Sequence, residues 1–260
     1  MSQPASEFPR RCSLLEWDSE LFGRRIARFE GACYTRADAD ATRRFCAEHG
    51  IDCVYLLLDA ADAASIAAAQ ACGADFVDVR MTLEGALEIV TEPEPQPRGP
   101  EVACEIRLAT ERDLPALRRL AATGHRRTRF YADSRFAADR VDRLYQTWIE
   151  KSCGGYADAV FVIDVARAAA GYVTCHLDDG VTGRIGLIAV RQDLRGQGVG
   201  AQLLRAARGR FLGAGCRSWT VATQGSNVAA LRLYQTYGFH VAAVQVWFHL
   251  WPAEAERGRL

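Results

Sequence analysis

The chain has 260 residues, of which 49% are hydrophobic, and its formal net charge is +0. This composition is typical of a globular protein. Zero net charge gives no overall positive field that would attract nucleic acid or an anionic membrane surface. The sequence also lacks the run of about 18 apolar residues that a membrane-spanning helix requires. We therefore predict a globular protein with neither nucleic acid nor membrane as a partner.

The nine cysteines occur without a CxxC pair and without a Cys/His cluster at zinc-ligand spacing. No apolar stretch follows the arginines near the N-terminus, so no signal peptide is predicted. Cysteines in a reducing compartment act as small buried hydrophobic residues. The expectation is a cytoplasmic protein without a bound metal.

A proline-rich segment divides the sequence. Residues 91–100 contain four prolines, which favour an extended backbone and exclude a helix. We predict a linker over residues 91–100 that separates a domain of residues 1–90 from a domain of residues 101–260.

Helical and strand patterns alternate along both domains. In chain order, the first domain is predicted to contain strand 26–29, helix 37–49, strand 53–58, helix 61–71 and strand 75–83. The second is predicted to contain strand 102–108, helix 113–122 with Thr110 as its N-cap, helix 139–151, strands 159–165, 171–177 and 184–190, helix 201–212, strand 218–223, helix 228–236 and strand 241–250. This order predicts an α/β or α+β fold with a mixed sheet.

A glycine cluster follows the apolar strand of residues 185–190 and precedes the predicted helix of residues 201–212. Glycines allow backbone N–H groups to converge, and a helix N-terminus adds unpaired N–H groups and a partial positive charge. This combination predicts a pyrophosphate-binding site.

Three glycine-rich loops have to be distinguished. A P-loop needs Gly-Lys-Ser/Thr, which is absent. The dinucleotide fingerprint matches formally at Gly196, Gly198 and Ala201, but a polar segment precedes the first glycine, and the next strand ends in Thr223-Gln224 without a carboxylate. The third pattern, (Arg/Gln)-x-x-Gly-x-(Gly/Ala), is satisfied over residues 195–200.

With this loop, residues 227–239 match N-x-x-A-x-x-L-Y-x-x-x-G-F. On these two motifs the sequence resembles the GNAT (GCN5-related N-acetyltransferase) superfamily over about residues 101–251. The resemblance implies a GNAT fold, a mixed and mostly antiparallel sheet flanked by helices, and acetyl-CoA as cofactor. Residues 16–23, 128–136 and 144–149 further resemble the dTDP-fucosamine acetyltransferase group. That group implies a smaller truncated GNAT-like domain before the complete one.

The same group implies transfer of acetyl to the 4-amino group of a dTDP-4-amino-4,6-dideoxyhexose. Two alternatives remain open: a protein, peptide or antibiotic amine as acceptor, or a CoA-binding sensor or scaffold without turnover. The oligomeric state is not fixed by the sequence, and a homodimer is one option.

The resemblance also implies roles for particular residues. Backbone N–H groups from Gln197 to Ala201 would bind the pyrophosphate, the strand ending at Val190 would pair with pantetheine, and Tyr234 would protonate the departing thiolate. Asn227 would bind the pantetheine arm or, alternatively, cap its helix. The predicted cofactor-binding residues are Leu187, Ile188, Ala189, Val190, Arg195, Gly196, Gln197, Gly198, Val199, Gly200, Ala201, Asn227 and Tyr234.

The acceptor side is less defined. Arg126, Arg127, Arg129 and Tyr131 form a basic and aromatic cluster that would bind a nucleotide diphosphate, or is simply a solvated loop. His176 is a further candidate for substrate binding. By residue type alone, the general base would be His176, Asp178, Glu150 or water.

Overall fold

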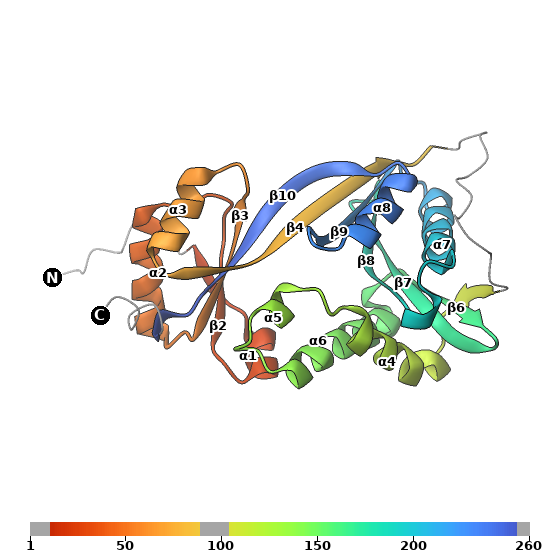
Figure 1. The fold of residues 1–260 in the computed structure, drawn as a ribbon, viewed down its shortest axis with the longest axis horizontal. Helices are drawn as coiled ribbons and strands as arrows, with labels where there is room; N and C mark the ends of the chain where they lie inside the picture. The colour runs from red at the N-terminus through yellow and green to blue at the C-terminus, as the bar shows by residue number, and fades with distance from the viewer. Residues whose placement is uncertain (1–10, 89–103, 254–260) are drawn as a thin grey trace. The chain divides into compact units, whose positions relative to one another are not determined.

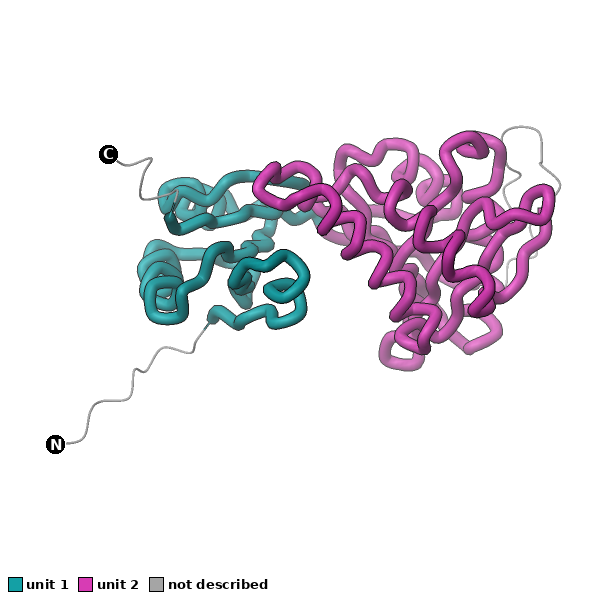
Figure 2. The backbone as a smooth tube through the Cα atoms, turned by 90° about the horizontal axis from the view of Figure 1, so that it is seen from below, with its two compact units in different colours: residues 1–79, 244–260 teal, residues 80–243 magenta. Residues whose placement is uncertain are grey.

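The computed structural model describes residues 11–88 and 104–253 (Figure 1). The chain divides into two compact units, unit 1 with residues 1–79 and 244–260 and unit 2 with residues 80–243 (Figure 2). This division runs through two strands. The predicted linker over residues 91–100 lies outside the described residues, and the predicted domain limits at residues 90 and 101 stay a prediction.

All nine cysteines lie in the described part of the chain, and none of them forms a disulfide. Across residues 11–88 and 104–253, no helix combines the length and the hydropathy needed to cross a membrane.

Unit 1 contains a small sheet and three helices. The strands are β1 (Cys12–Leu14), β2 (Ile26–Phe29) and β3 (Cys53–Asp59), and the helices are α1 (Glu16–Phe22), α2 (Arg36–His49) and α3 (Ala63–Ala71). β1 pairs antiparallel with β2, which runs parallel to β3. The predicted elements in this stretch are confirmed, whereas β1 and α1 were not predicted.

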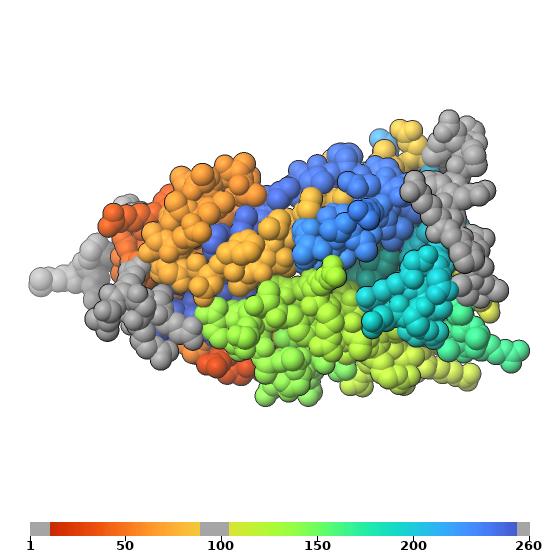
Figure 3. All heavy atoms as spheres, viewed as in Figure 1, coloured from red at the N-terminus to blue at the C-terminus, as the bar shows by residue number. Residues whose placement is uncertain are grey.

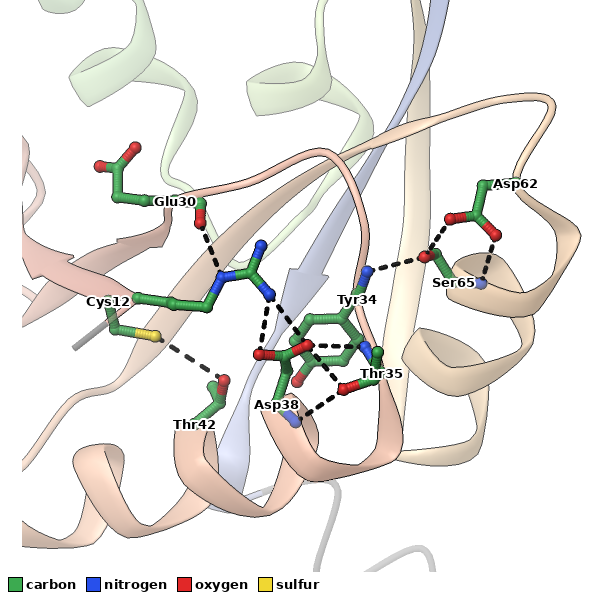
Figure 4. A network of polar contacts seen from close by, with 9 residues as sticks. Cys12, Glu30, Tyr34, Thr35, Asp38, Thr42, Asp62 and Ser65 are labelled. Carbon is green, nitrogen blue, oxygen red and sulfur yellow. Dashed lines mark hydrogen bonds and ion pairs between the residues drawn. The ribbon is translucent and has the colours of Figure 1, made fainter. Parts of the chain in front are cut away.

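Side-chain caps fix where helices α2 and α3 of unit 1 begin (Figure 4). Thr35 accepts a hydrogen bond from the backbone N–H of Asp38 at 3.2 Å, and the Asp38 carboxylate accepts one from the Thr35 N–H at 2.9 Å. This reciprocal pair is a capping box. Asp62 caps α3 by accepting from the Ser65 N–H at 3.0 Å, so this helix starts two residues later than predicted.

Unit 2 is built on a mixed sheet flanked by helices. Its elements are β5 (Glu105–Leu108), α4 (Leu114–Gly124), α5 (Arg129–Ala132), α6 (Ala138–Lys151), β6 (Ala159–Val165), β7 (Ala168–Asp178), β8 (Thr182–Val190), α7 (Val199–Gly213), β9 (Ser218–Gln224) and α8 (Val228–Thr236). All strand pairs along the series β5 to β8 are antiparallel, and β8 runs parallel to β9. The predicted fold class is confirmed.

Two details of unit 2 differ from the prediction. Thr110 does form a capping box with Asp113, but it caps a short 3-10 turn that precedes α4. The second difference is α5, which was not predicted. Of the strand predicted over residues 102–108, residues 102 and 103 lie outside the described residues.

Each unit completes its sheet with a strand that leads in from the other half of the chain. β4 (Ala74–Ala86) follows α3, yet its residues from Arg80 to Ala86 pair antiparallel with β9 in unit 2. β10 (His240–Leu250) follows α8, yet its residues from Gln245 to Leu250 pair antiparallel with β3 in unit 1. We call this arrangement the strand exchange. Glycines with left-handed backbone precede both strands, Gly73 with φ 89° and Gly238 with φ 77°.

Helix α7 is held firmly on the sheet of unit 2. Five of its apolar side chains are buried in the core together with Leu83 and Trp219 of the sheet, namely Val199, Leu203, Leu204, Ala207 and Phe211. Because Val199 stands in the first turn and is fully buried, this packing fixes the position of the helix N-terminus.

Candidate active site

A cleft of about 1240 Å³ lies in unit 2. Three stretches of chain line it: residues 123–127 from the end of α4 into the following loop, residues 188–201 from the end of β8 into α7, and residues 224–237 from the end of β9 through α8. The space-filling view shows the green, cyan and blue segments of unit 2 that contain these stretches on one face (Figure 3).

The cleft opens where two parallel strands separate. β8 and β9 pair from Thr182 with Ser218 to Ile185 with Val221. Within the described chain this pairing goes no further, although β8 continues to Val190 and β9 to Gln224. The facing edges of both strands are therefore available to a ligand with backbone-like amide groups.

The hydrogen bonds of β8 show which of its groups face this opening. Arg191 donates its backbone N–H to the carbonyl of Ala170 at 2.7 Å, and the N–H of Leu187 bonds Thr174 Oγ1 at 2.8 Å. Both partners belong to β7. Since successive residues of a strand direct their N–H groups to opposite edges, the N–H groups of Ile188 and Val190 face away from β7, toward the opening.

The glycine loop places the start of α7 at the cleft. Gly196 and Gly198 have φ angles of 77° and 78°, a left-handed conformation that a residue with a side chain rarely adopts. Gly198 is the N-cap of α7, and no side chain caps the helix. The N–H groups of the first turn are thus left for an anionic ligand.

Among the described residues, the charged side chains that line the cleft are all basic. Its lining includes Arg126, Arg127, Arg195 and Arg232, and no acidic residue of the described chain belongs to it. Arg126 pairs with Asp142 at 3.1 Å, whereas Arg127 and Arg195 donate to the backbone carbonyls of Ser226 and Val190. The lining therefore suits a ligand with several negative charges.

Tyr234 and Asn227 lie on the α8 side of the cleft. Tyr234 lines it although only 2% of the residue is exposed, and burial raises the pKa of its phenol above the ordinary value. Asn227 donates to Thr223 Oγ1 at 3.1 Å and makes no side-chain cap to α8, so the capping alternative is not observed. Tyr237 bonds the carbonyl of Ala201 at 3.0 Å and joins α8 to α7.

His125 is a cleft residue that no sequence pattern indicated. It follows the last residue of α4, and its Nε2 lies 2.9 Å from the Oη of Tyr172. Burial, followed by the charge of Arg195, lowers the pKa of His125 to about 4. The sequence contained no signal for it, because its partners come from distant segments.

Some predicted residues do not line the cleft. Leu187, Gln197, Val199, Arg129, Tyr131 and His176 are outside its lining. Tyr131 bonds the Asp142 carboxylate, and the guanidinium of Arg129 lies 4.0 Å from the centre of the Phe130 ring. Among the base candidates, Asp178 pairs with Arg184 at 2.6 Å and Glu150 with Arg118 at 2.7 Å.

His176 is buried beneath Tyr156, with ring centroids 5.4 Å apart. Burial and the charge of Arg184 lower the pKa of His176. In the described chain, no group of three His, Cys, Asp or Glu side chains is arranged to hold a metal ion.

Comparison with known proteins gives a consistent picture. A sequence profile of the acetyltransferase (GNAT) family matches residues 120–239. A dTDP-fucosamine acetyltransferase of Escherichia coli O6:H1 is 36% identical over 146 residues, which cover 55% of this chain and 61% of that protein. The spore coat polysaccharide biosynthesis protein SpsD of Bacillus subtilis is 26% identical over 149 residues, which cover 55% of this chain and 49% of that protein. The chain thus matches about half to three fifths of the length of these relatives.

A solved structure supports the fold. The GCN5-related N-acetyltransferase of Sphaerobacter thermophilus superposes with a TM-score of 0.62, covers 92% of this chain and 75% of its own, and is 16% identical in sequence. Residues 120–239 thus match the GNAT family of acetyltransferases, and the chain shares the fold of a GNAT structure.

Proposed function

We propose that unit 2 binds acetyl-CoA in the cleft and transfers the acetyl group to a primary amine. The observation that carries the proposal is the meeting of three features in one lining: the uncapped N-terminus of α7, the unpaired edge of β8 and the phenol of Tyr234. The first suits a pyrophosphate, the second suits the amides of pantetheine, and the third is a proton donor.

In the reaction, the neutral amine attacks the carbonyl carbon of the thioester, and a C–N bond forms while the C–S bond breaks. The N–H of Ile188 faces the cleft and would stabilise the negative charge that develops on the carbonyl oxygen. The thiolate that leaves takes the proton of Tyr234, and the phenolate regains a proton from water before the next turnover. The proton of the amine goes to water, because the described lining offers no carboxylate to accept it.

The acceptor that we propose is the 4-amino group of a nucleotide-linked amino sugar. The support comes from the two relatives, since one is named for acetylating dTDP-fucosamine and the other for polysaccharide biosynthesis. Arg126 and Arg127 lie in the loop after α4 and line the cleft. Their charges would bind the diphosphate of such a sugar.

Binding of the cofactor is tested first. Titration calorimetry with acetyl-CoA is expected to detect one site per chain whose affinity falls as salt rises, because the ligand is polyanionic. Arg232, which has no ion-pair partner among the described residues, should contribute, and Arg232→Gln is expected to weaken binding about fivefold, or about 1 kcal/mol. Arg217→Gln, at an exposed position outside the lining, serves as the matched control. Absence of measurable binding would contradict the proposal.

The acceptor is tested by release of the thiol from acetyl-CoA in the presence of a panel of amines. We expect dTDP-fucosamine to give a kcat/KM at least about 100-fold above those of free amino sugars, polyamines and a lysine peptide, because loss of charged contacts to the diphosphate costs several kcal/mol. A preference for the peptide would reject the sugar acceptor and leave the acetyl transfer intact.

A further inference from the structure

His125 lies against the strand that forms one wall of the cleft. The residue before it, Gly124, packs so closely on β8 that an added Cβ would lie 2.8 Å from the Cβ of Ala189. This glycine therefore lets the end of α4 approach the strand directly. As a result, His125 belongs to the same lining as Ile188 and Ala189.

Two aromatic residues hold the imidazole in place. Its Nε2 is 2.9 Å from the Oη of Tyr172, which faces Ala189 across the β7–β8 ladder. Its ring stacks on that of Tyr145 from α6, with centroids 4.7 Å apart and an interplanar angle of 16°. Tyr172 is fully buried and Tyr145 is 5% exposed. A rotation out of this plane would lose the stacking on Tyr145, and a flip of the ring would move Nε2 away from the Tyr172 hydroxyl.

The hydrogen bond with Tyr172 determines where the imidazole carries its proton. Within the described residues, the Tyr172 hydroxyl has His125 as its hydrogen-bond partner and no other. A buried hydroxyl that failed to donate would cost about 1–3 kcal/mol, so Tyr172 donates and Nε2 accepts. The neutral ring then carries its hydrogen on Nδ1.

The surroundings keep this ring neutral. The groups that face it are the phenols of Tyr172 from β7 and Tyr145 from α6 and the guanidinium of Arg195 from the glycine loop. Burial, then the charge of Arg195, lowers the pKa of His125 to about 4. Such a ring is a poor proton acceptor near pH 7, but it is an N–H donor throughout the neutral range.

We propose that His125 is a catalytic residue whose Nδ1–H donates a hydrogen bond to the carbonyl oxygen of the bound thioester. The inference rests on the acetyl transfer proposed above. As the amine attacks, that oxygen gains negative charge, and the side chain of His125 and the backbone N–H of Ile188 supply two donors for it. No proton is transferred to or from His125 in this step.

Substitutions that mimic either ring nitrogen test the role. Asparagine can place an N–H donor near the position of Nδ1, whereas glutamine reaches the position of Nε2. With acetyl-CoA and dTDP-fucosamine, we expect His125→Gln and His125→Ala to lower kcat about 100-fold and His125→Asn to restore most of it. The Kd for acetyl-CoA should change less than about threefold. A kcat of His125→Ala within about threefold of wild type would overturn the inference.

The pH profile separates a donor from a base. For a donor with a depressed pKa, kcat should show the same pH dependence between pH 5.5 and 9 in wild type and in His125→Gln. An acid limb that is present in the wild type and lost in His125→Gln would show that His125 acts as a base, and would overturn the inference.

Nitrogen-15 NMR of the imidazole in the protein without ligands provides a readout that does not depend on turnover. At pH 7 we expect a neutral ring protonated on Nδ1, and in Tyr172→Phe a mixture of both tautomers. A charged ring, or one protonated on Nε2, would overturn the inference even if acetyl transfer is confirmed. Failure of the proposed function would instead appear as loss of acetyl-CoA binding with this NMR signature intact.

The same depressed pKa predicts how stability depends on pH. Because the folded protein binds the proton of His125 less well than the unfolded chain, whose histidine has a pKa near 6.5, falling pH favours unfolding between about pH 6.5 and 4. Above about pH 6.5 His125 is neutral in both the folded and the unfolded state, so it no longer makes the free energy of unfolding depend on pH. Urea titrations should show a smaller loss of stability over this window in His125→Gln than in wild type. An equal loss in both proteins would contradict the depressed pKa.

Discussion

Replacing Tyr234 with phenylalanine is expected to lower kcat by about 100- to 1000-fold and to leave the affinity for CoA nearly unchanged. The ring is 2% exposed and packs on Phe239 with centroids 5.7 Å apart, and phenylalanine fills the same space. Only the proton donor is removed. Burial raises the pKa of Tyr234, and the same desolvation makes a thiolate in the cleft more basic, which offsets the weaker acidity of the phenol.

The matched control for this experiment lies on the same side of the cleft. Tyr237 also lines the cleft, but its hydroxyl bonds the carbonyl of Ala201 and serves the packing of α8 on α7. Tyr237→Phe should therefore lose about 1 kcal/mol of stability and retain kcat within about threefold. Rapid-quench kinetics with both variants will show whether the chemical step is the one affected. Wild-type turnover in Tyr234→Phe would reject the acid role.

A fragment of residues 101–260 is expected not to fold cooperatively, although the sequence predicts these residues to be a domain. The fragment lacks β4, whose Leu83 is fully buried in the core of unit 2 beside Trp219 and whose residues pair along the whole of β9. Leu83 and Leu87, which is 6% exposed, are both lost, and their burial contributes about 3–6 kcal/mol to the free energy of unfolding. Natural domains are stable by only about 5–15 kcal/mol.

Circular dichroism and urea titration will measure this effect, and the missing strand provides its own control. A synthetic peptide of residues 74–88 added in trans should restore part of the transition, whereas the same peptide with Leu83→Asp should not. A fragment that unfolds cooperatively without the peptide, at a urea midpoint close to that of the full chain, would show that the strand exchange is dispensable for unit 2.

The local pattern of the sequence was sufficient to predict most helices and strands and one wall of the candidate site. The residues of α8 were predicted with the observed bounds, since an apolar spacing of 3.6 residues and the stop at Gly238 are local signals. The position of the glycine loop at the start of α7 was likewise predictable, because both features adjoin in the chain. The short elements β1 and α1 were missed, as three to seven residues carry little periodicity.

Features that depend on residues far apart in the chain could not be predicted from the sequence. The alternation over residues 75–83 predicts a strand, but it does not say that this strand pairs with β9. The divergence of β8 and β9 after Ile185 is a property of two strands together. His125 gained its environment from Tyr145 and Tyr172, the latter 47 residues away. A histidine after a helix has no local signature for such a neighbourhood.

The strand exchange has a consequence for synthesis on the ribosome. Residues 53–59 leave the ribosome tunnel long before residues 245–250, the strand that pairs with them. Until then one edge of β3 stays open, and such an edge can recruit strands of other nascent chains. Translation that stalls before residue 245 should therefore yield an aggregation-prone product, and ribosome-bound intermediates of this length are where a chaperone would be needed most.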